Sequence, residues 1–343
     1  KNLAFNYKKL SKIANQSICA ATIKADAYGI GVIKTFETLF KNKCRHFFVA
    51  TTEEAIEIRK KKLLANVYVL NGLESNELSI FNNNNIIPII NDKDEYNFVI
   101  KKIKQYKKLK FGIHIDTGLN RLGLDINDLL KINSYHNKIH ILLSHLSSAD
   151  EGKNNYNILQ NNKFKSAINL KINAKYNSLS NSMGIILGNN FHHDLVRPGI
   201  SLYGGHFNTK MKQIIKPVIC LKGKILQIKE ISKNEFVGYN QTYKTHKKLK
   251  VAIVGIGYAD GISRVLSNKG NAYFKNKTFK IIGRVSMDSI TVDISKNNKL
   301  IKVGDYMEII NHSNGIDKIA NQCNTICDEI LTSISKRVKR VYI

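Results

Sequence analysis

One lysine, Lys24, stands where a short apolar segment ends and a turn of small residues begins. The segment CAATIKADAYGIG covers residues 19–31, and its first part favours a β-strand. A lysine amine at such a position could hold a carbonyl compound as a Schiff base, because a deprotonated amine is a good nucleophile. A single lysine at a strand end is more often a solvated terminus, so this assignment depends on what lies beside it.

Polar or small residues also follow several later β-prone runs. They are Asp116, Arg121, His145, Asn181, Ser182, Arg197, Gly199 and Ile200. Each alone has an ordinary explanation, such as a helix cap or a turn. Small residues at Ser182 and Gly199 would let backbone N–H groups approach phosphate oxygens. A phosphate site opposite the amine of Lys24 suits pyridoxal 5'-phosphate, whose aldehyde reacts with lysine.

A barrel of parallel strands would bring these residues to one rim. Eight β-prone runs are found at 17–24, 46–51, 66–71, 86–90, 111–116, 139–146, 176–181 and 194–204. Helix-like stretches lie between most of them, at 32–42, 52–62, 74–82, 92–106, 125–135 and 155–172. Strand–helix alternation implies right-handed parallel crossovers, and eight repeats favour a (β/α)8 barrel over residues 1–215. An open doubly wound sheet is less consistent, because the chain has no Rossmann glycine fingerprint.

The pattern changes at about residue 216. Long β-prone runs at 216–231, 249–259, 278–294 and 303–310 are joined by tight turns containing Gly, Asn and Asp. Little helix lies between them, apart from a short stretch near 317–323. This pattern predicts a mainly antiparallel β domain over residues 216–343.

Composition argues against several other classes of protein. The 343 residues carry a net charge of +28, but the basic residues are spread along the chain together with many Asn and Ile, which share AT-rich codons. No nucleic-acid-binding motif, metal-ligand spacing, signal peptide or membrane-spanning run is visible. Five scattered cysteines indicate a reducing compartment rather than a disulfide framework. We therefore expect a cytoplasmic protein that binds no nucleic acid, membrane or metal, although the first residue is not Met and a leader could have been removed.

The motifs together resemble the alanine racemase family along nearly the whole chain. KADAYGIG is similar to the family's cofactor-lysine motif, and DTGLNRLG, SHLSSAD, NSMG and RPGISLYG follow in the family's order. In the second domain, GYNQTY, GYADG and GRVSMD also match. The resemblance implies a (β/α)8 barrel followed by a β domain, pyridoxal 5'-phosphate as cofactor, and interconversion of L-alanine and D-alanine. In bacteria this activity supplies D-alanine for the cell wall.

The resemblance also implies a role for each site residue. Lys24 and Tyr239 would be the catalytic pair, each moving a proton on one face of the substrate α-carbon. Cofactor contacts would come from Lys24, Tyr28, His145, Asn181, Ser182, Arg197, Gly199 and Ile200, and substrate contacts from Arg121, Tyr258 and Met287. Arg197 would face the pyridine nitrogen and restrain transamination, because arginine does not give up its proton. Asp288 would order the loop that carries Met287.

Tyr239, Tyr258 and Met287 reach a second subunit in the family, so the resemblance implies a homodimer with shared active sites. Two positions depart from the family pattern. His114 stands where many relatives have a lysine, often carboxylated, that steadies the substrate-binding arginine. Lys336 stands where a phosphate-binding tyrosine is common.

Two other functions remain open at this point. A broad-specificity or serine racemase of the same fold would share the catalytic pair and differ in its pocket lining. A pyridoxal-phosphate carrier protein with a related barrel would lack the β domain, against which GYNQTY and GYADG argue.

Overall fold

The computed structural model describes residues 1–130, 138–170, 172–296 and 300–343. The chain divides into two compact units, Lys1–Lys216 and Pro217–Ile343, and each is described by itself. No helix among the described residues is long and apolar enough to span a bilayer.

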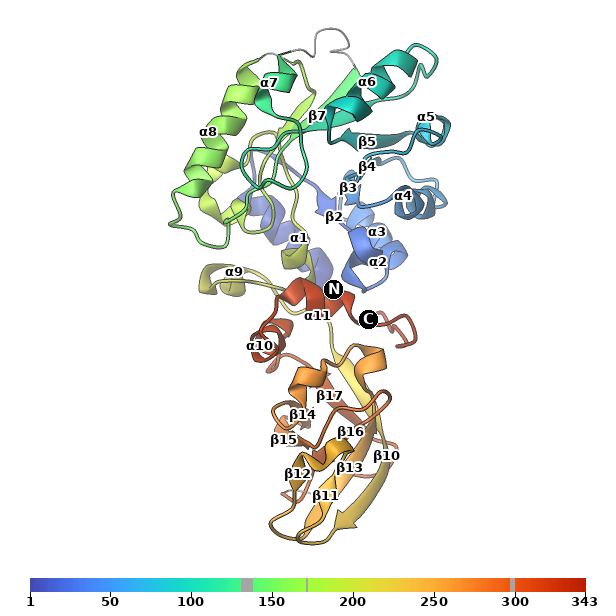
Figure 1. Cartoon of the computed structure of the whole chain (residues 1–343), viewed down its shortest axis with the longest axis vertical. Helices are drawn as coiled ribbons and strands as arrows, with labels where there is room; N and C mark the ends of the chain where they lie inside the picture. Colours follow the sequence, from blue (N-terminus) through green and yellow to red (C-terminus); the bar gives the residue numbers. More distant parts are fainter. Residues whose placement is uncertain (131–137, 171, 297–299) are drawn as a thin grey trace. The chain divides into compact units, whose positions relative to one another are not determined.

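The first unit contains a parallel sheet whose seven strands follow chain order (Figure 1). Its strands are β2 (Ala21–Thr22), β3 (His46–Val49), β4 (Asn66–Val69), β5 (Ile86–Ile90), β6 (Phe111–His114), β7 (Ile139–Leu143) and β8 (Tyr176–Ser178). A further parallel pair joins β1 (Ile18–Cys19) to β9 (Leu195–Val196). The N–H of Arg197 donates to the carbonyl of Ser180 at 2.9 Å, which links β9 to the chain after β8. The ring therefore has eight strand positions, and the predicted barrel is confirmed.

The single strand predicted over residues 17–24 is wrong in detail. Ile18–Cys19 pairs with β9, whereas Ala21–Thr22 pairs with β3. The run therefore forms two short strands, β1 and β2, which hydrogen-bond to opposite neighbours where the barrel closes. Lys24 lies two residues beyond the end of β2.

Helices lie outside the strands, as Figure 1 shows. They are α1 (Asn2–Ile13), α3 (Val32–Lys41), α4 (Thr52–Arg59), α5 (Leu78–Asn84), α6 (Lys93–Lys102), α7 (Ile126–Leu129), α8 (Tyr156–Asn169) and α9 (Thr209–Ile214). Side chains cap several of these helices; at α4 and α6, for example, Thr51 and Asp92 accept hydrogen bonds from the N–H of the third helical residue. The helix predicted over 125–135 is described only as α7, since residues 131–137 lie outside the described part. The last crossover uses 3₁₀ turns, η2 (Gly184–Leu187) and η3 (Asn189–Phe191).

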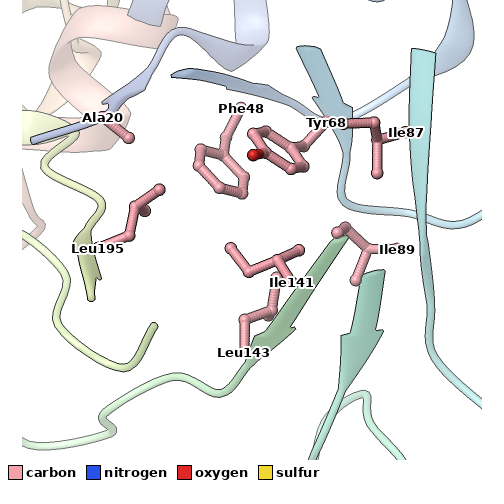
Figure 2. Packing of buried hydrophobic residues seen from close by; sticks show 8 residues of the cluster. All are labelled: Ala20, Phe48, Tyr68, Ile87, Ile89, Ile141, Leu143 and Leu195. Atoms are coloured by element: carbon pink, nitrogen blue, oxygen red, sulfur yellow. The ribbon is translucent and has the colours of Figure 1, made fainter. Parts of the chain in front are cut away.

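Apolar side chains from different strands fill the barrel interior (Figure 2). The cluster comprises Ala20, Phe48, Tyr68, Ile87, Ile89, Ile141, Leu143 and Leu195. The rings of Phe48 and Tyr68 stack with centroids 4.3 Å apart. Since the interior is packed with side chains, a ligand of this unit would have to bind in the loops at the rim.

A buried polar chain crosses the same interior nearer the start of the strands. Tyr68 Oη lies 2.8 Å from His46 Nδ1 and 3.1 Å from His140 Nδ1. Burial, together with nearby lysines, lowers the pKa of His46 to about 4 and that of His140 to about 3. Both imidazoles are therefore neutral at neutral pH.

Acid is expected to destabilise the protein between about pH 6.5 and pH 4, because the unfolded chain binds these protons first. Each depressed histidine lowers the free energy of unfolding by up to about 1.4 kcal/mol per pH unit as the pH falls through that window. Between about pH 6.5 and pH 5, the free energy of unfolding should fall by roughly 2 kcal/mol less in His140→Phe than in the wild type. Urea unfolding at both pH values measures this, with the exposed His246→Phe as control. Equal losses in the His140 variant and the wild type would contradict the assignment.

The second unit is a closed antiparallel barrel with strand order β10-β13-β16-β15-β14-β17. Its strands are β10 (Leu221–Ile231), β13 (Leu249–Gly255), β14 (Asn271–Phe274), β15 (Lys277–Ile282), β16 (Ile290–Asp293) and β17 (Tyr306–Ile310). A small hairpin pairs β11 (Phe236–Val237) with β12 (Tyr243–Lys244), and two helices, α10 (Ile316–Gln322) and α11 (Cys327–Thr332), follow the barrel in sequence. The antiparallel prediction is confirmed.

The long strand predicted over residues 278–294 is interrupted. Gly283 has a φ of +73°, and a Cβ there would lie 2.7 Å from the carbonyl oxygen of Val237. The chain therefore turns away after β15 and returns as β16. The intervening segment, residues 284–289, carries Met287 and Asp288.

Candidate active site

Lys24 is followed by a turn of left-handed backbone, a conformation that residues other than glycine rarely adopt. The segment labelled α2 (Lys24–Tyr28) has φ values of +53°, +53°, +54° and +57° at Ala25, Asp26, Ala27 and Tyr28. Left-handed backbone costs about 1–2 kcal/mol per non-glycine residue, so this turn must be held by its surroundings. Such strain is concentrated at functional sites in proteins. The sequence indicated a turn here, but not its hand.

The left-handed turn places Tyr28 against the end of the last strand. Tyr28 is buried, and its ring lies 4.8 Å from that of Tyr203. A Cβ at Gly199 would lie 2.3 Å from the hydroxyl oxygen of Tyr28, so a larger residue there would displace that hydroxyl. The N–H of Gly199 donates to Ser182 Oγ at 2.9 Å, and that of Ser201 donates to it at 3.2 Å. The structure thus brings Tyr28, Ser182 and Gly199 together, and Ile200 follows as the first residue of η4 (Ile200–Tyr203).

Arg197 is a buried cation at the end of β9. Its guanidinium donates to Ser178 Oγ and to the carbonyl oxygen of Ser144, which fixes the plane of the group. Burial lowers the pKa of Arg197 to about 10, so the group stays charged at neutral pH. The guanidinium carbon also lies 5.8 Å from the ring centroid of Phe48 in the barrel interior.

His145 follows β7 and is neutral. Asn181 Oδ1 accepts hydrogen bonds from the N–H groups of Met183 and Gly184, so its Nδ2 faces His145 Nε2 at 3.4 Å. Burial lowers the pKa of His145 well below its usual value, and Arg197, Arg121, His114 and Lys24 lower it further.

The loop after β6 carries Arg121 on an exposed turn. Asp116 shapes this loop, because its Oδ1 accepts from the N–H groups of Gly118 and Asn120 at 2.8 and 3.1 Å. Gly123 has a φ of +121°, and a Cβ there would lie 2.6 Å from the backbone nitrogen of Asp116. The DTGLNRLG segment therefore closes on itself and presents Arg121 at its outer side.

His114, the last residue of β6, is held in one tautomer. Asn91 Nδ2 donates to the carbonyl oxygens of Leu70 and Ile89, so its Oδ1 must accept from His114 Nδ1 at 2.9 Å. Burial, Arg197 and Arg121 lower the pKa of His114 to about 4. At neutral pH the ring is uncharged, and its Nε2 carries a lone pair.

Gln160 is a site-supporting residue that the sequence analysis missed. It is fully buried on α8, where its Nε2 donates to the carbonyl of His145 at 3.0 Å and to Thr117 Oγ1 at 3.3 Å. Its Oε1 accepts from the N–H of Ser147 at 2.9 Å. The side chain thereby joins the loops after β6 and β7. A glutamine on a helix face carries no sequence signal for this task.

In the second unit, backbone hydrogen bonds connect the GYADG and GRVSMD motifs. The N–H groups of Tyr258 and Ala259 donate to the carbonyls of Ser286 and Met287, both at 3.0 Å. A Cβ at Gly257 would lie 2.3 Å from the carbonyl oxygen of Met287, so the contact requires glycine. Tyr258, Met287 and Tyr239 remain 44%, 53% and 67% exposed.

Arg337, also missed in the sequence analysis, clamps these segments. It donates to Asp260 Oδ1 at 2.7 Å and to Asp288 Oδ1 at 2.6 Å, and both carboxylates raise its pKa. Asp260 Oδ2 in turn accepts from the N–H of Gly257 at 2.8 Å. Its neighbour Lys336 is exposed, and the phosphate contact of Lys336 stays a prediction.

Comparisons with known proteins cover both units. Family models described as the N-terminal and C-terminal domains of alanine racemase match residues 1–206 and 218–342. A curated alanine racemase of Rickettsia canadensis is 36% identical, with 98% of this chain and 95% of the relative covered. One from Brucella suis is also 36% identical, with coverage of 99% and 91%.

Solved structures show the same similarity. A crystal structure of alanine racemase from Bartonella henselae with covalently bound pyridoxal phosphate superposes with a TM-score of 0.94 at 36% identity, covering 100% of this chain and 97% of that one. The biosynthetic alanine racemase of Pseudomonas aeruginosa gives 0.90 at 27% identity, with coverage of 100% and 97%.

Proposed function

The chain belongs to the alanine racemase family, and we propose that it interconverts L-alanine and D-alanine with pyridoxal 5'-phosphate as cofactor. The observation that carries this proposal is the rim of the first unit. There a lysine held by a strained turn, a small-residue cradle and a buried arginine all follow barrel strands. Relatives that are 36% identical over nearly the whole chain are named alanine racemases, which supports the same reaction here.

The rim residues fit the cofactor in their chemistry. The hydroxyl groups of Tyr28 and Ser182 both lie beside Gly199, and two neighbouring hydroxyl groups suit a phosphate group. Arg197 offers a fixed, charged donor for the pyridine nitrogen, and Lys24 offers the amine that bonds to the aldehyde. When bound, pyridoxal phosphate supplies a ring that delocalises the negative charge developing at the substrate α-carbon.

We assign proton transfer to Lys24 and Tyr239. Inversion at a carbon requires removal of a proton on one face and delivery on the other, so two groups must act. Lys24 Nζ would serve one face and Tyr239 Oη the other, as general base and general acid in alternation. Arg197 keeps its own proton at neutral pH and therefore donates a hydrogen bond without protonating its partner.

We assign the substrate carboxylate to Arg121, with Tyr258 and Met287 at the substrate end of the site. His114 is neutral, so it leaves the positive charge of Arg121 uncompensated and available to a carboxylate. His145 and Asn181 would border the cofactor from the loops after β7 and β8. These assignments are consistent with a small amino acid as the substrate.

We propose a homodimer whose subunits share their active sites. Tyr239, Tyr258 and Met287 are large side chains that stay about half exposed or more on one chain, and are therefore available to contact a partner. A cytoplasmic location stays a prediction.

The proposed reaction is tested by incubating purified protein and pyridoxal phosphate separately with L-alanine, D-alanine and L-serine, and resolving the enantiomers by chiral chromatography. We expect racemisation of alanine in both directions, with kcat/KM for alanine roughly 10–100-fold above that for serine, since one added hydroxyl is discriminated modestly. Faster turnover of serine would instead support a serine or broad-specificity racemase. A bound cofactor without any racemisation would support a carrier protein.

A further inference from the structure

The left-handed turn after Lys24 needs an external support. Alanine and tyrosine do not favour positive φ, and aspartate adopts it mainly as a single residue, yet four residues in succession adopt it here. Within the turn, the N–H of Ala27 donates to the carbonyl of Ile23 at 3.0 Å, and that of Gly29 donates to the carbonyl of Ala25 at 2.8 Å. These local bonds close one turn, but they do not attach it to the rest of the barrel.

Glu54, on the first turn of α4, makes that attachment. Its Oε1 accepts a hydrogen bond from the N–H of Ala25 at 2.6 Å, and its Oε2 accepts one from the N–H of Ala50 at 2.7 Å. Each carboxylate oxygen therefore binds one backbone amide. One amide belongs to the residue directly after Lys24, and the other belongs to the loop that follows β3.

This geometry departs from ordinary helix capping. Thr51-Thr52-Glu53-Glu54 has the capping-box pattern, in which the glutamate returns to the N–H of the N-cap residue. Thr51 does cap α4, accepting from the N–H of Glu54 at 3.5 Å. The carboxylate of Glu54 instead reaches past Thr51 to Ala50 and across to Ala25. Charge-assisted bonds of this kind are short and strong, which suits a clamp on strained backbone.

The other end of the turn is held independently. Asp26 Oδ1 accepts from the N–H of Val32 at 2.7 Å, at the start of α3. The turn is thus fixed on its exit side by its own carboxylate, and on its Lys24 side by a carboxylate from another helix. Removal of Glu54 releases the amide of Ala25 directly after the lysine, while the N–H of Ile23 before it still donates to the carbonyl of Phe48 at 2.8 Å.

We propose that Glu54 is a positioning residue for Lys24. It holds the backbone directly after the lysine, and this fixes the point on the rim from which the lysine side chain extends. The catalytic part of this inference rests on the proposed function of Lys24. Displacement of a reacting group by about 1 Å can reduce turnover by about a hundredfold, so the clamp has a measurable consequence.

The first test uses the protein without cofactor. Amide hydrogen exchange is compared for the wild type, Glu54→Ala, Glu54→Gln and the control Glu53→Gln, which removes an exposed charge from the same helical turn. We expect exchange at Ala25 and Ala50 to be about tenfold faster in Glu54→Ala, with a smaller increase in Glu54→Gln, which keeps one acceptor oxygen. Unchanged protection at Ala25 in Glu54→Ala would overturn the clamp.

The second test follows Lys24 itself. Cofactor trapped on Lys24 by borohydride is quantified over time by peptide mass spectrometry, together with kcat and KM for alanine. We expect trapping to be slower and kcat to fall 10–100-fold in Glu54→Ala, with KM within about threefold and Glu53→Gln unchanged. Wild-type trapping and kcat in Glu54→Ala would limit Glu54 to stabilising α4 and overturn its positioning role. Absence of trapping in the wild type would instead refute the proposed function, while amide exchange would still report on the clamp.

Discussion

Replacing Lys24 with alanine is expected to abolish alanine racemisation, with kcat/KM reduced by at least about 10⁴-fold. The substitution removes both the amine that bonds to the cofactor and one of the two proton-transfer groups, and a single general base alone contributes about 10²–10⁴-fold. Wild-type protein mixed with pyridoxal phosphate should show a visible absorbance band that borohydride abolishes. The variant should bind the cofactor without this covalent signature.

The matched control for this substitution is Lys34→Ala on α3. Lys34 is exposed and pairs with Glu37 at 3.4 Å, so its loss removes an equal charge from a solvated helix position. It should leave the absorbance band and the activity at wild-type values, because exposed ion pairs contribute little. A borohydride-sensitive band that persists in Lys24→Ala would assign the covalent attachment to another lysine and refute the proposed site.

Replacing Tyr239 with phenylalanine should keep the cofactor band and reduce racemisation by about 10²–10⁴-fold, because only the hydroxyl that transfers the proton is lost. The variant should also become one-sided. In D₂O, exchange of the α-proton should persist for one enantiomer of alanine, the one whose proton faces Lys24, and should nearly cease for the other. Proton NMR of each pure enantiomer during incubation measures both rates separately.

Tyr306→Phe provides the comparison, since Tyr306 is another tyrosine of the second unit and is 56% exposed. It should leave both exchange rates unchanged. If Tyr239→Phe slows exchange equally for the two enantiomers, the hydroxyl supports substrate binding rather than acting on one face. If it slows neither, the two-base assignment fails.

The two substitutions separate attachment from proton transfer. Lys24 lies on the first unit and Tyr239 on the second, and each is described within its own unit. Tyr239 is 67% exposed there, so its hydroxyl contributes little to the folding of its own unit. Tyr239→Phe should therefore leave the stability of the protein nearly unchanged, within about 0.5 kcal/mol, while removing most of its activity.

The sequence by itself determined the architecture and the rim. Strand–helix alternation followed by closely spaced strands is a periodic signal, and periodicity depends on which side chains each element buries. The fold class could therefore be predicted before any contact was known. Lys24, His145, Ser182 and Arg197 could be placed on one rim for the same reason, because carboxyl ends of parallel strands share one edge.

The ends of individual strands could be predicted less accurately from the sequence. The run at 17–24 splits because its two halves hydrogen-bond to β9 and β3, and the run at 278–294 breaks where Gly283 meets the carbonyl of Val237. Both breaks arise from partners distant in the chain. Local β propensity is the same on either side of each break, so it could not reveal them.

The tertiary structure alone decided how the site residues are held. No local propensity places Ala25 or Tyr28 in left-handed backbone; that conformation depends on Glu54, 29 residues away, and on packing against Tyr203. The tautomer of His114 depends on Asn91, and the joining of two loops depends on Gln160. The residues in these three hydrogen bonds are 15, 23 and 29 positions apart in the sequence. They produce no periodic pattern in the sequence, because each is a single hydrogen bond that can form only once the barrel has closed.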